Sequence, residues 1–371
     1  MKKKLFTSIF LLIFITTSLF ANLNYKFEIL SLDPIHKGYL ADKSCPEFSV
    51  NYSSFSEGFP SRILQNDFKW NEEEGRNDYV IEVYDFNGEL DPPGSMFNLK
   101  IGETLSLGRS TFDFDSFLSP IAFDVTMQGL AHNFYTGAFD GIFSYDSIYF
   151  LGFSFRVADK VSMRFGLNHH CSHYGDMMLK LVQKPYGDNP PYSDFNVLYK
   201  FLRMNDRCIG LSIEPTKNIR VYGELLYPPR DIDFLRPKMF APHWKRPDTN
   251  DYPDSYQDRI VYVGVELSYP IFKKLGNTTL AYNVRFYEQG KVKYNIENGS
   301  SVWFDEDAPW EREHDIKINQ ELNQTMSLEA NYHYGRSIIN NFYFEQTKIL
   351  SIGVRYNPKS NIVLLDTKKT V

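Results

Sequence analysis

The sequence predicts an all-β protein, an antiparallel transmembrane β-barrel of about 12 strands, with about 10 to 14 as the range. Three observations lead to this prediction. The chain begins with an export signal, most of it alternates apolar and polar residues, and it is rich in aromatic residues without being hydrophobic overall. Its aromatic share is 16%, whereas its mean hydropathy is −0.37. A barrel with an apolar outer face and a polar lumen has this combination.

Residues 1–21 have the organisation of a secretory signal peptide. Three lysines follow Met1, an apolar run begins at Leu5, and a small residue, Ala21, ends the segment. An uncleaved anchor is the alternative, but the apolar run is shorter than the roughly 20 residues that a spanning helix needs. No cysteine lies near Ala21, which argues against lipoprotein processing. Since no later run is apolar enough for a transmembrane helix, a membrane-spanning part has to be built from strands.

The charge balance and the cysteine content narrow the class of protein. The formal net charge is −6 and no basic run follows the signal, so nucleic acid is not a predicted partner. The predicted partners are outer-membrane lipid and small solutes in the lumen, and no cofactor is predicted. Cys45, Cys171 and Cys208 are odd in number, so at most one disulfide joins two of them.

The chain divides into four parts around a single domain. Residues 1–21 are the signal peptide, 22–44 a polar lead-in on the periplasmic side, 45–356 the barrel and 357–371 a polar C-terminal tail. Within the barrel, alternating segments are typical of strands with one apolar and one polar face. These segments are residues 48–52, 121–128, 149–157, 161–168, 261–269, 280–286, 326–334 and 350–356.

A secreted soluble sandwich is the alternative fold, because its strands alternate in the same way against a second sheet. The signal peptide, the length of the strands and aromatic residues at strand ends favour the barrel, where such residues form an interfacial girdle. Those residues are Tyr269, Tyr332, Tyr334 and Tyr356. The tail beyond Tyr356 departs from the pattern, since outer-membrane barrels commonly end on an aromatic residue.

Two long connections interrupt the strands. Residues 228–257 are rich in proline and charge, and residues 288–312 contain an acidic run. Long loops of a bacterial barrel point outwards and short turns face the periplasm. We therefore predict that both connections are extracellular and that short periplasmic turns lie at Asn205–Asp206 and Leu275–Asn277. Three of the four tryptophans lie in the long connections: Trp244, Trp303 and Trp310.

Candidate chemistry gathers at residues 169–176, His-His-Cys-Ser-His-Tyr-Gly-Asp, where the alternating segment that begins at Val161 ends. Residues i and i+2 of a strand share a face and lie about 6.6 Å apart. This parity predicts an apolar face that carries His169, Cys171 and His173, and a polar face that carries His170 and Ser172. A bulge at Asn168 would exchange the two faces.

The first interpretation of this cluster is a membrane-embedded lipid hydrolase. Outer-membrane phospholipases and lipid A deacylases are barrels whose nucleophilic serine lies two residues after the histidine that activates it, on the membrane-facing side of a strand. His169 with Cys171 has this spacing on the apolar face, and His170 with Ser172 has it on the polar face. On the membrane side the nucleophile therefore has to be a cysteine, whose thiolate is intrinsically reactive.

Two further interpretations are open. In the second, His169, His173 and Asp176 bind a metal ion. The two histidines lie about 13 Å apart on a straight strand, too far for one ion, so the chain would have to turn at Gly175. In the third, which we favour, the polar side chains satisfy backbone groups where the strand enters a Gly-Asp turn.

The predicted direction of this strand also argues against a hydrolase. Hairpins counted backwards from Tyr356, with separate strands at residues 194–204 and 206–214, make the segment 161–173 run towards the periplasm. The cluster would then lie away from the outer leaflet, where such hydrolases act.

Two segments resemble the signatures of an uncharacterised family of Gram-negative envelope proteins. Residues 39–52 are similar to its early L-A-D-P-x-x-P-x-F segment, and residues 164–176 to its later motif, H-x-S-S-H-x-G-D. Cys171 stands where the family has its first serine, and Met177 stands where an acidic residue usually follows. The resemblance covers about residues 39–230 and implies an envelope location and a shared fold, with no activity attached.

The sequence therefore favours an outer-membrane barrel of non-enzymatic role, either a small pore or a structural envelope protein. The alternative is the membrane-embedded hydrolase. Its candidate catalytic residues are His169, His170, Cys171 and Ser172.

Overall fold

The computed structural model describes the barrel and the segments next to it. The predicted signal peptide and nearly all of the predicted loop 228–257 lie outside the described residues. The described ranges are 23–58, 62–71, 76–85, 94–114, 116–136, 141–176, 201–227, 257–289, 292–295, 300–303, 310–340, 346–358 and 362–366.

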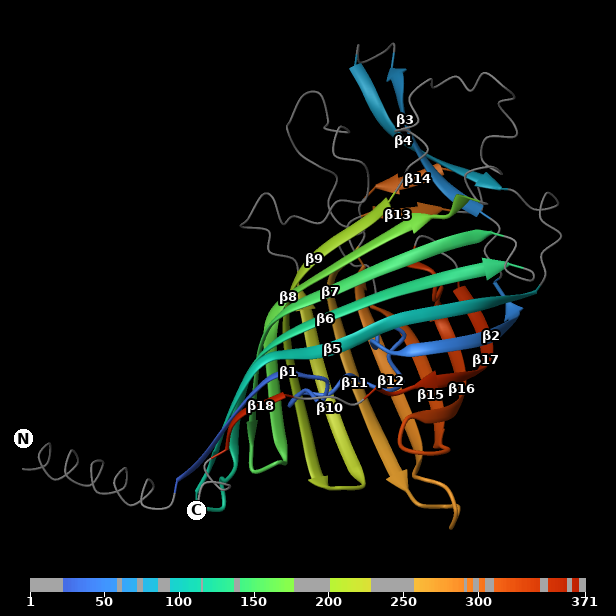
Figure 1. The fold of residues 1–371 in the computed structure, drawn as a ribbon. Coiled ribbons are helices and arrows are strands. Elements are labelled where there is room, and N and C mark those ends of the chain that lie inside the picture. The colour runs from blue at the N-terminus through green and yellow to red at the C-terminus, as the bar shows by residue number, and fades with distance from the viewer. Residues whose placement is uncertain are drawn as a thin grey trace, which may run out of the picture.

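A ring of antiparallel strands forms a closed barrel (Figure 1). The main sheet has 14 strands, and two of them, β1 (Asn24–Ser31) and β18 (Ile362–Asp366), lie outside the ring. In order around the ring, the strands are β2 (Phe48–Glu57), β17 (Gln346–Tyr356), β16 (Met326–Arg336), β15 (Glu311–Glu321), β12 (Thr278–Gln289), β11 (Gln257–Tyr269), β10 (Ile219–Tyr227), β9 (Phe201–Thr216), β8 (Val161–Tyr174), β7 (Ile142–Val157), β6 (Ile121–Thr136) and β5 (Ser95–Asp113). Pairing between β5 and β6 closes the ring at 12 strands, which confirms the predicted fold class.

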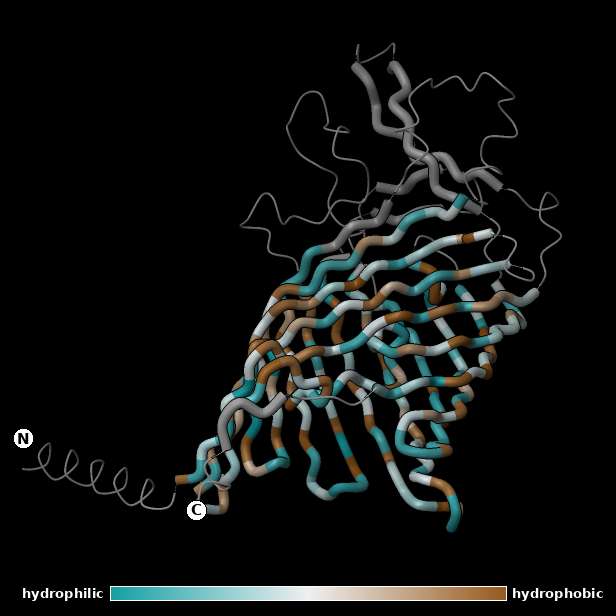
Figure 2. The backbone as a smooth tube through the Cα atoms, viewed as in Figure 1, coloured by the Kyte–Doolittle hydropathy of each residue, from teal (hydrophilic) through white to brown (hydrophobic). Residues whose placement is uncertain are grey.

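Hydrophobic and hydrophilic residues alternate along the strands of the wall (Figure 2), and their exposure shows that the apolar side chains face outwards and the polar ones inwards, the reverse of a soluble protein. On β6, Phe123, Val125 and Met127 are exposed, whereas Asp124 and Thr126 between them are buried. The alternation repeats around the ring, with exposed side chains that include Tyr149, Leu151, Phe153, Phe165, Leu211, Val263, Leu328 and Ile352. A continuous apolar belt of this kind is the lipid-facing surface of a barrel that spans a membrane. Among the described residues, no helix is long and apolar enough to cross a membrane.

The two ends of the barrel differ in the length of their connections. The turn end, as we call it, carries the short connections, including the predicted turn at 275–277: residues 114–120, 158–160, 217–218, 270–277 and 322–325. The opposite loop end carries the longest connections, together with the short connection 137–141, and lies at the top of Figure 1. Two hairpins belong to these connections, β3 (Arg62–Asn71) with β4 (Arg76–Asp85) and β13 (Val292–Asn295) with β14 (Ser300–Trp303). The predicted loop 288–312 therefore contains the second hairpin.

The predicted turn at Asn205–Asp206 is wrong, because both residues lie inside β9, a single strand of 16 residues. Asn205 pairs with His169 of β8, and Asp206 pairs with Asn168. The Asn205 side chain contacts His169, and the Asp206 side chain is buried and lines a lumen pocket, so neither residue belongs to a turn. With β9 counted once, β8 runs from the turn end to the loop end. Its direction is opposite to the predicted one.

β1 and β18 extend the sheet at one side of β5, which corrects the predicted lead-in and tail. β5 has 19 residues, but β2 pairs only with Ser95–Lys100. β1 pairs with the later part of β5, from Ser106 to Asp113, on the same side as β2. β18 pairs in turn with β1. These pairings cover backbone groups of β5 that β2 does not reach. They also give the chain beyond Tyr356 a structural role.

Residues 32–47, which we call the plug segment, enter the barrel and fill its lumen. The sequence predicts most of this segment as a lead-in outside the barrel, and the structure corrects that prediction. Its buried residues are Ile35, His36, Tyr39, Ala41, Asp42, Lys43, Cys45, Pro46 and Glu47. Two cavities between the plug segment and the wall hold about 30 Å³ each, against about 10–15 Å³ for one water molecule. The plug segment therefore narrows the lumen at this level, and a larger cavity of about 770 Å³ lies between the segment and the turn end.

The plug segment is held by polar contacts to the wall. Tyr39 stacks on Tyr222 of β10 with ring centroids 4.1 Å apart, and its hydroxyl donates to Glu224 at 2.8 Å. Arg164 of β8 binds both oxygens of the same carboxylate, at 2.6 and 2.8 Å. Lys43 donates to Glu313 of β15 at 2.7 Å. Buried charges of the segment thus meet opposite charges on the wall.

Candidate functional site

β8 presents its two sets of candidate residues to opposite faces, as the parity predicted. His170 and Ser172 are buried inside the barrel, with exposed fractions of 6% and 0%. His169, Cys171 and His173 are half-buried and share the outer face with Leu167, which is 46% exposed. Each residue from Val161 to His173 pairs in unbroken register with β7, so no bulge exchanges the faces.

Four outward residues form what we call the membrane-facing cluster: His169, Cys171, His173 and Asn205. Cys171 Sγ lies 2.8 Å from His173 Nε2, which makes a thiol–imidazole pair. His169 Nδ1 lies 2.7 Å from Asn205 Oδ1 of β9. Because the amide oxygen can only accept, Nδ1 carries the proton and Nε2 of His169 is left as an acceptor. Cys171 therefore has an imidazole two residues away on each side along the same face.

Aromatic and apolar side chains frame this cluster. The His173 ring stacks on Tyr145 of β7 with centroids 4.7 Å apart and an interplanar angle of 12°. Tyr149, 54% exposed, stacks in the same way against His169 at 6.1 Å. These contacts fix the orientation of both imidazole rings at the surface that meets lipid. A cysteine next to an oriented imidazole is the arrangement of an activated nucleophile.

The cluster lies in the last part of β8, next to the loop end of the barrel. This position corrects the predicted one, which placed the cluster at the end with short turns. The cause is the single strand β9, which changes the parity of the strand count. The direction of β8 is therefore no longer an argument against a membrane-facing hydrolase.

The lumen side of β8 carries a second, separate set of polar residues. His170 Nε2 lies 3.4 Å from Ser172 Oγ and 2.9 Å from Asn340 Nδ2, and Asn340 donates to Asp146 at 2.7 Å. All four side chains are buried inside the barrel. Lipid cannot reach this set, so the second candidate pair is not placed for lipid chemistry. Sequence reasoning missed Asn340 and Asp146, since neither lies near the motif.

The predicted metal site of His169, His173 and Asp176 is not formed, since these three described residues do not bring their ligand atoms within 4.8 Å of one another. Asp176 instead accepts a hydrogen bond from the backbone N–H of Ile142 at 3.0 Å. Gly175 approaches the same strand so closely that a Cβ would lie 1.8 Å from the Ile142 carbonyl oxygen. The turn-lock interpretation therefore describes Gly175 and Asp176.

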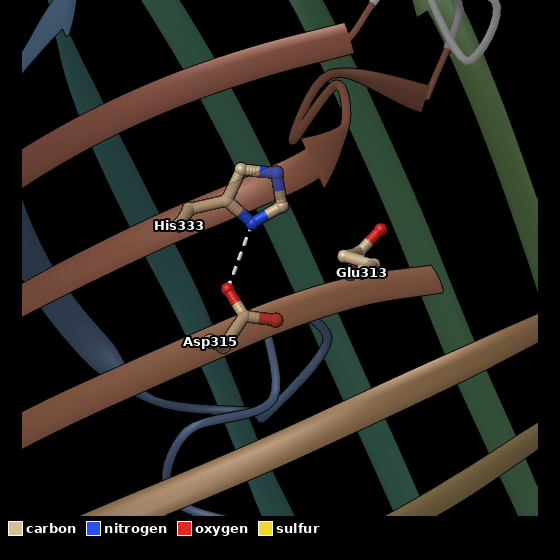
Figure 3. Close-up of side chains that lie close together, drawn as sticks. All are labelled: Glu313, Asp315 and His333. Carbon is tan, nitrogen blue, oxygen red and sulfur yellow. Dashed lines mark hydrogen bonds and ion pairs between the residues drawn. The ribbon is translucent and has the colours of Figure 1, made fainter. Parts of the chain in front are cut away.

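One group of three residues in the described part of the chain does bring ligand atoms within 4.8 Å, namely Glu313, Asp315 and His333 (Figure 3). The His333 nitrogens face Asp315 Oδ1 at 2.8 Å and the Arg336 carbonyl at 2.6 Å. Neither nitrogen is left over for a metal ion. Glu313 is already paired with Lys43 of the plug segment. This group is an ion-pair network of the lumen rather than a metal centre.

All three cysteines are thiols outside any disulfide, and they differ in access. Cys45 and Cys208 are buried, with exposed fractions of 4% and 1%, whereas Cys171 is half-buried on the outer face. Burial raises the pKa of the Cys45 thiol to about 11. Because the thiolate is the reactive form, the Cys45 thiol is inert at neutral pH.

We therefore expect brief treatment of the folded protein with N-ethylmaleimide to label Cys171 and to spare Cys45 and Cys208. Intact mass and peptide mapping would show one adduct, at Cys171. Treatment in urea is the control, where all three thiols should react. An adduct at Cys208 in the folded protein would contradict the arrangement of faces described above.

Comparisons with known proteins found solved structures of low similarity. No family model matches the chain and no curated protein matches it, so the resemblance to an uncharacterised envelope family stays a prediction. The outer membrane phospholipase A of Escherichia coli is 12% identical, with 84% of this chain and 93% of that chain covered and a TM-score of 0.42. The NanC porin is 10% identical (84% and 100%, TM-score 0.39), and the toluene transporter TodX of P. putida is 8% identical (85% and 88%, TM-score 0.33). None of these likenesses bears on the chemistry of the cluster.

Proposed function

We propose that the protein is an outer-membrane hydrolase that cleaves acyl esters of membrane lipid, with Cys171 as nucleophile and His173 as its base. The observation that carries this proposal is the 2.8 Å contact between Cys171 Sγ and His173 Nε2 on the lipid-facing side of β8. Short turns of such barrels face the periplasm and longer loops face outwards. The cluster, near the loop end, then lies at the level of the outer leaflet.

The first half of the reaction forms a thioester. His173 Nε2 takes the thiol proton, and the thiolate of Cys171 attacks the ester carbonyl carbon of the lipid. A C–S bond forms, the ester C–O bond breaks, and the imidazolium returns its proton to the leaving alkoxide. The product that leaves is a lysolipid.

The second half releases the fatty acid. Water attacks the thioester carbonyl while His169 Nε2, left as an acceptor by the Asn205 contact, takes a proton from it. A new C–O bond forms, the C–S bond breaks, and the proton passes to the Cys171 thiolate. The Cys171 thiol is regenerated with one fatty acid as product, and no other reactant is consumed.

The filled lumen favours the hydrolase over the small pore that the sequence favoured. The plug segment crosses the barrel, and two of the spaces beside it, at the level of Asp42 to Glu47, are only about 30 Å³ each. An open pore requires a continuous aqueous path. The membrane-facing cluster, in contrast, needs no access to the lumen.

Fatty acid release from lipid vesicles by the purified protein tests the proposal. We expect release from phospholipid or lipid A vesicles, and we expect prior treatment with N-ethylmaleimide to stop it, because Cys171 is the accessible thiol. Release that persists after complete modification of Cys171 would show that another group is the nucleophile. No release from either lipid by protein with an unmodified Cys171 would overturn the proposal.

Replacement of Asn205 with alanine is expected to slow the second half of the reaction selectively. Without the amide, the His169 ring loses the contact that holds it in the tautomer that accepts a proton from water. We expect turnover to fall by about 10²-fold while an acyl adduct accumulates on Cys171. Mass spectrometry would detect this adduct, and its absence from the Asn205→Ala, Cys171→Ala double variant is the control. Lower turnover without an adduct would contradict the role given to His169.

A further inference from the structure

The plug segment carries a carboxylate into a site built from basic residues of the wall. Glu47 is 2% exposed. Its carboxylate lies 3.0 Å from Lys100 Nζ, 3.1 Å from Lys317 Nζ and 3.3 Å from Arg355 Nη1. These cations come from β5, β17 and β15, which lie within five neighbouring strands, so the site occupies the inner face of one side of the barrel. One acidic wall residue, Glu329, also contacts Lys317 at 2.8 Å.

Three cations thus face one acidic residue of the wall and one of the plug segment. With Glu47 in place the site has three positive and two negative charges. If the segment leaves, one negative charge leaves with it, and the wall retains a net charge of +2 at this position. A wall site of that charge binds a small anion in place of the Glu47 carboxylate.

Several contacts of the plug segment are hydrogen bonds that water can replace, whereas the buried ion pairs of Asp42, Lys43 and Glu47 hold the segment in the closed position. Arg220 donates to the carbonyls of Lys37 and Gly38, at 2.6 and 2.7 Å, and Glu266 accepts from the N–H of Leu40 at 2.8 Å. Exchange of such hydrogen bonds for bonds to water changes the free energy by only about 0.5–1.5 kcal/mol each. The segment itself contains no strand or helix that would have to unfold.

The turn end offers space into which the segment can move. A cavity of about 770 Å³ lies there, lined by the plug residues Pro34, Lys37, Leu40 and Pro46 and by turn residues of the wall such as Asn218 and Asn277. Both ends of the segment are anchored beside the same wall strand, since β1 and β2 each pair with β5. The segment can therefore swing out as a loop while the barrel stays closed.

We infer that the barrel has a second function, as a conduit for small carboxylates and other small anions that opens when the plug segment swings towards the turn end. In the closed state Glu47 occupies the position of the solute on Lys100, Lys317 and Arg355. In the open state these three residues form the anion-selective part of the lumen. The conduit does not depend on the membrane-facing cluster, which lies on the other side of the wall.

Conductance in planar bilayers tests this inference with KCl as the probe. We expect the wild type to be mostly closed and the Glu47→Gln variant to show an open probability at least ~10-fold higher, which corresponds to about 1.4 kcal/mol in the closing equilibrium. In a KCl gradient the reversal potential of the open variant should show anion selectivity. Addition of Lys100→Gln and Lys317→Gln should lower that selectivity, and acetate should pass as chloride does.

Several outcomes would overturn the inference. If Glu47→Gln protein inserts as a folded barrel but never conducts, the plug segment does not leave the lumen. Cation selectivity of the open variant would contradict the role given to the three basic residues. Should Glu47→Gln fail to fold, Asp42→Asn loosens the contact of the segment with Arg285 and is measured in the same way. Cys171→Ala protein should behave as the wild type in this assay, which separates the conduit from the hydrolase.

Discussion

Replacement of Cys171 with alanine is expected to abolish lipid hydrolysis, with kcat lowered by at least ~10³-fold. Alanine leaves the outer face of β8 apolar and removes only the atom that attacks the ester carbonyl. The imidazoles of His169 and His173 remain, but neither forms the thioester on which the second half of the reaction depends. The measurement is fatty acid release from vesicles, together with the loss of the acyl adduct from the intact mass.

Ser172→Ala is the matched control, because Ser172 is the next residue of the same strand and faces the lumen. We expect this variant to retain wild-type hydrolysis. Activity that depends on Ser172 and not on Cys171 would move the reaction to the lumen set of His170 and Asn340, and it would refute the proposed nucleophile. Unchanged hydrolysis in Cys171→Ala protein would likewise show that Cys171 is not the nucleophile.

Replacement of Glu313 with methionine is expected to lower the free energy of unfolding by about 3–5 kcal/mol. The Glu313 carboxylate is fully buried, and it accepts from Lys43 at 2.7 Å and from the Tyr287 hydroxyl at 2.8 Å. Its removal leaves the Lys43 ammonium inside the barrel without its carboxylate partner, next to the Ser337 carbonyl and the Tyr287 ring. Urea unfolding from detergent micelles, followed by tryptophan fluorescence, would measure the loss.

A double variant distinguishes an unpaired charge from a packing defect. Lys43→Met in the Glu313→Met background removes the charge that has lost its partner, so the double variant should be more stable than Glu313→Met alone. Glu57→Ala is the surface control, since its ion pair with Lys348 is exposed and should hardly affect the unfolding midpoint. If the double variant is less stable than both single variants, the loss comes from packing and the buried pair is not its cause.

The local alternation of side chains is enough to predict the architecture of the wall. On β6 and β8 the period of two assigns each residue to lipid or lumen, and the structure places Phe123, Met163, Asp124 and Arg164 accordingly. The same rule separates Cys171 from Ser172 on the sequence alone. Parity is predictable because consecutive side chains of any strand point to opposite faces, whatever the strand pairs with.

Sequence polarity is misleading where a residue's partner lies far away along the chain. Asn205 and Asp206 have the polarity of a turn, although both lie within one unbroken strand that pairs with β8. That one error reversed the predicted direction of β8 and, with it, the predicted position of the candidate site. Asn340 could not be assigned to His170, 170 residues away, since no local pattern connects them.

The sequence by itself determined that this protein is a barrel with an apolar outside, and it determined which histidines and which possible nucleophile share a face. Only the tertiary structure decided that Asn205 orients His169, that the cluster lies at the loop end, and that residues 32–47 fill the lumen. The physical reason is that strand parity is a property of neighbouring residues. Cross-strand register, ring closure and the ion pairs of an irregular segment such as 32–47 depend on residues brought together from distant parts of the sequence.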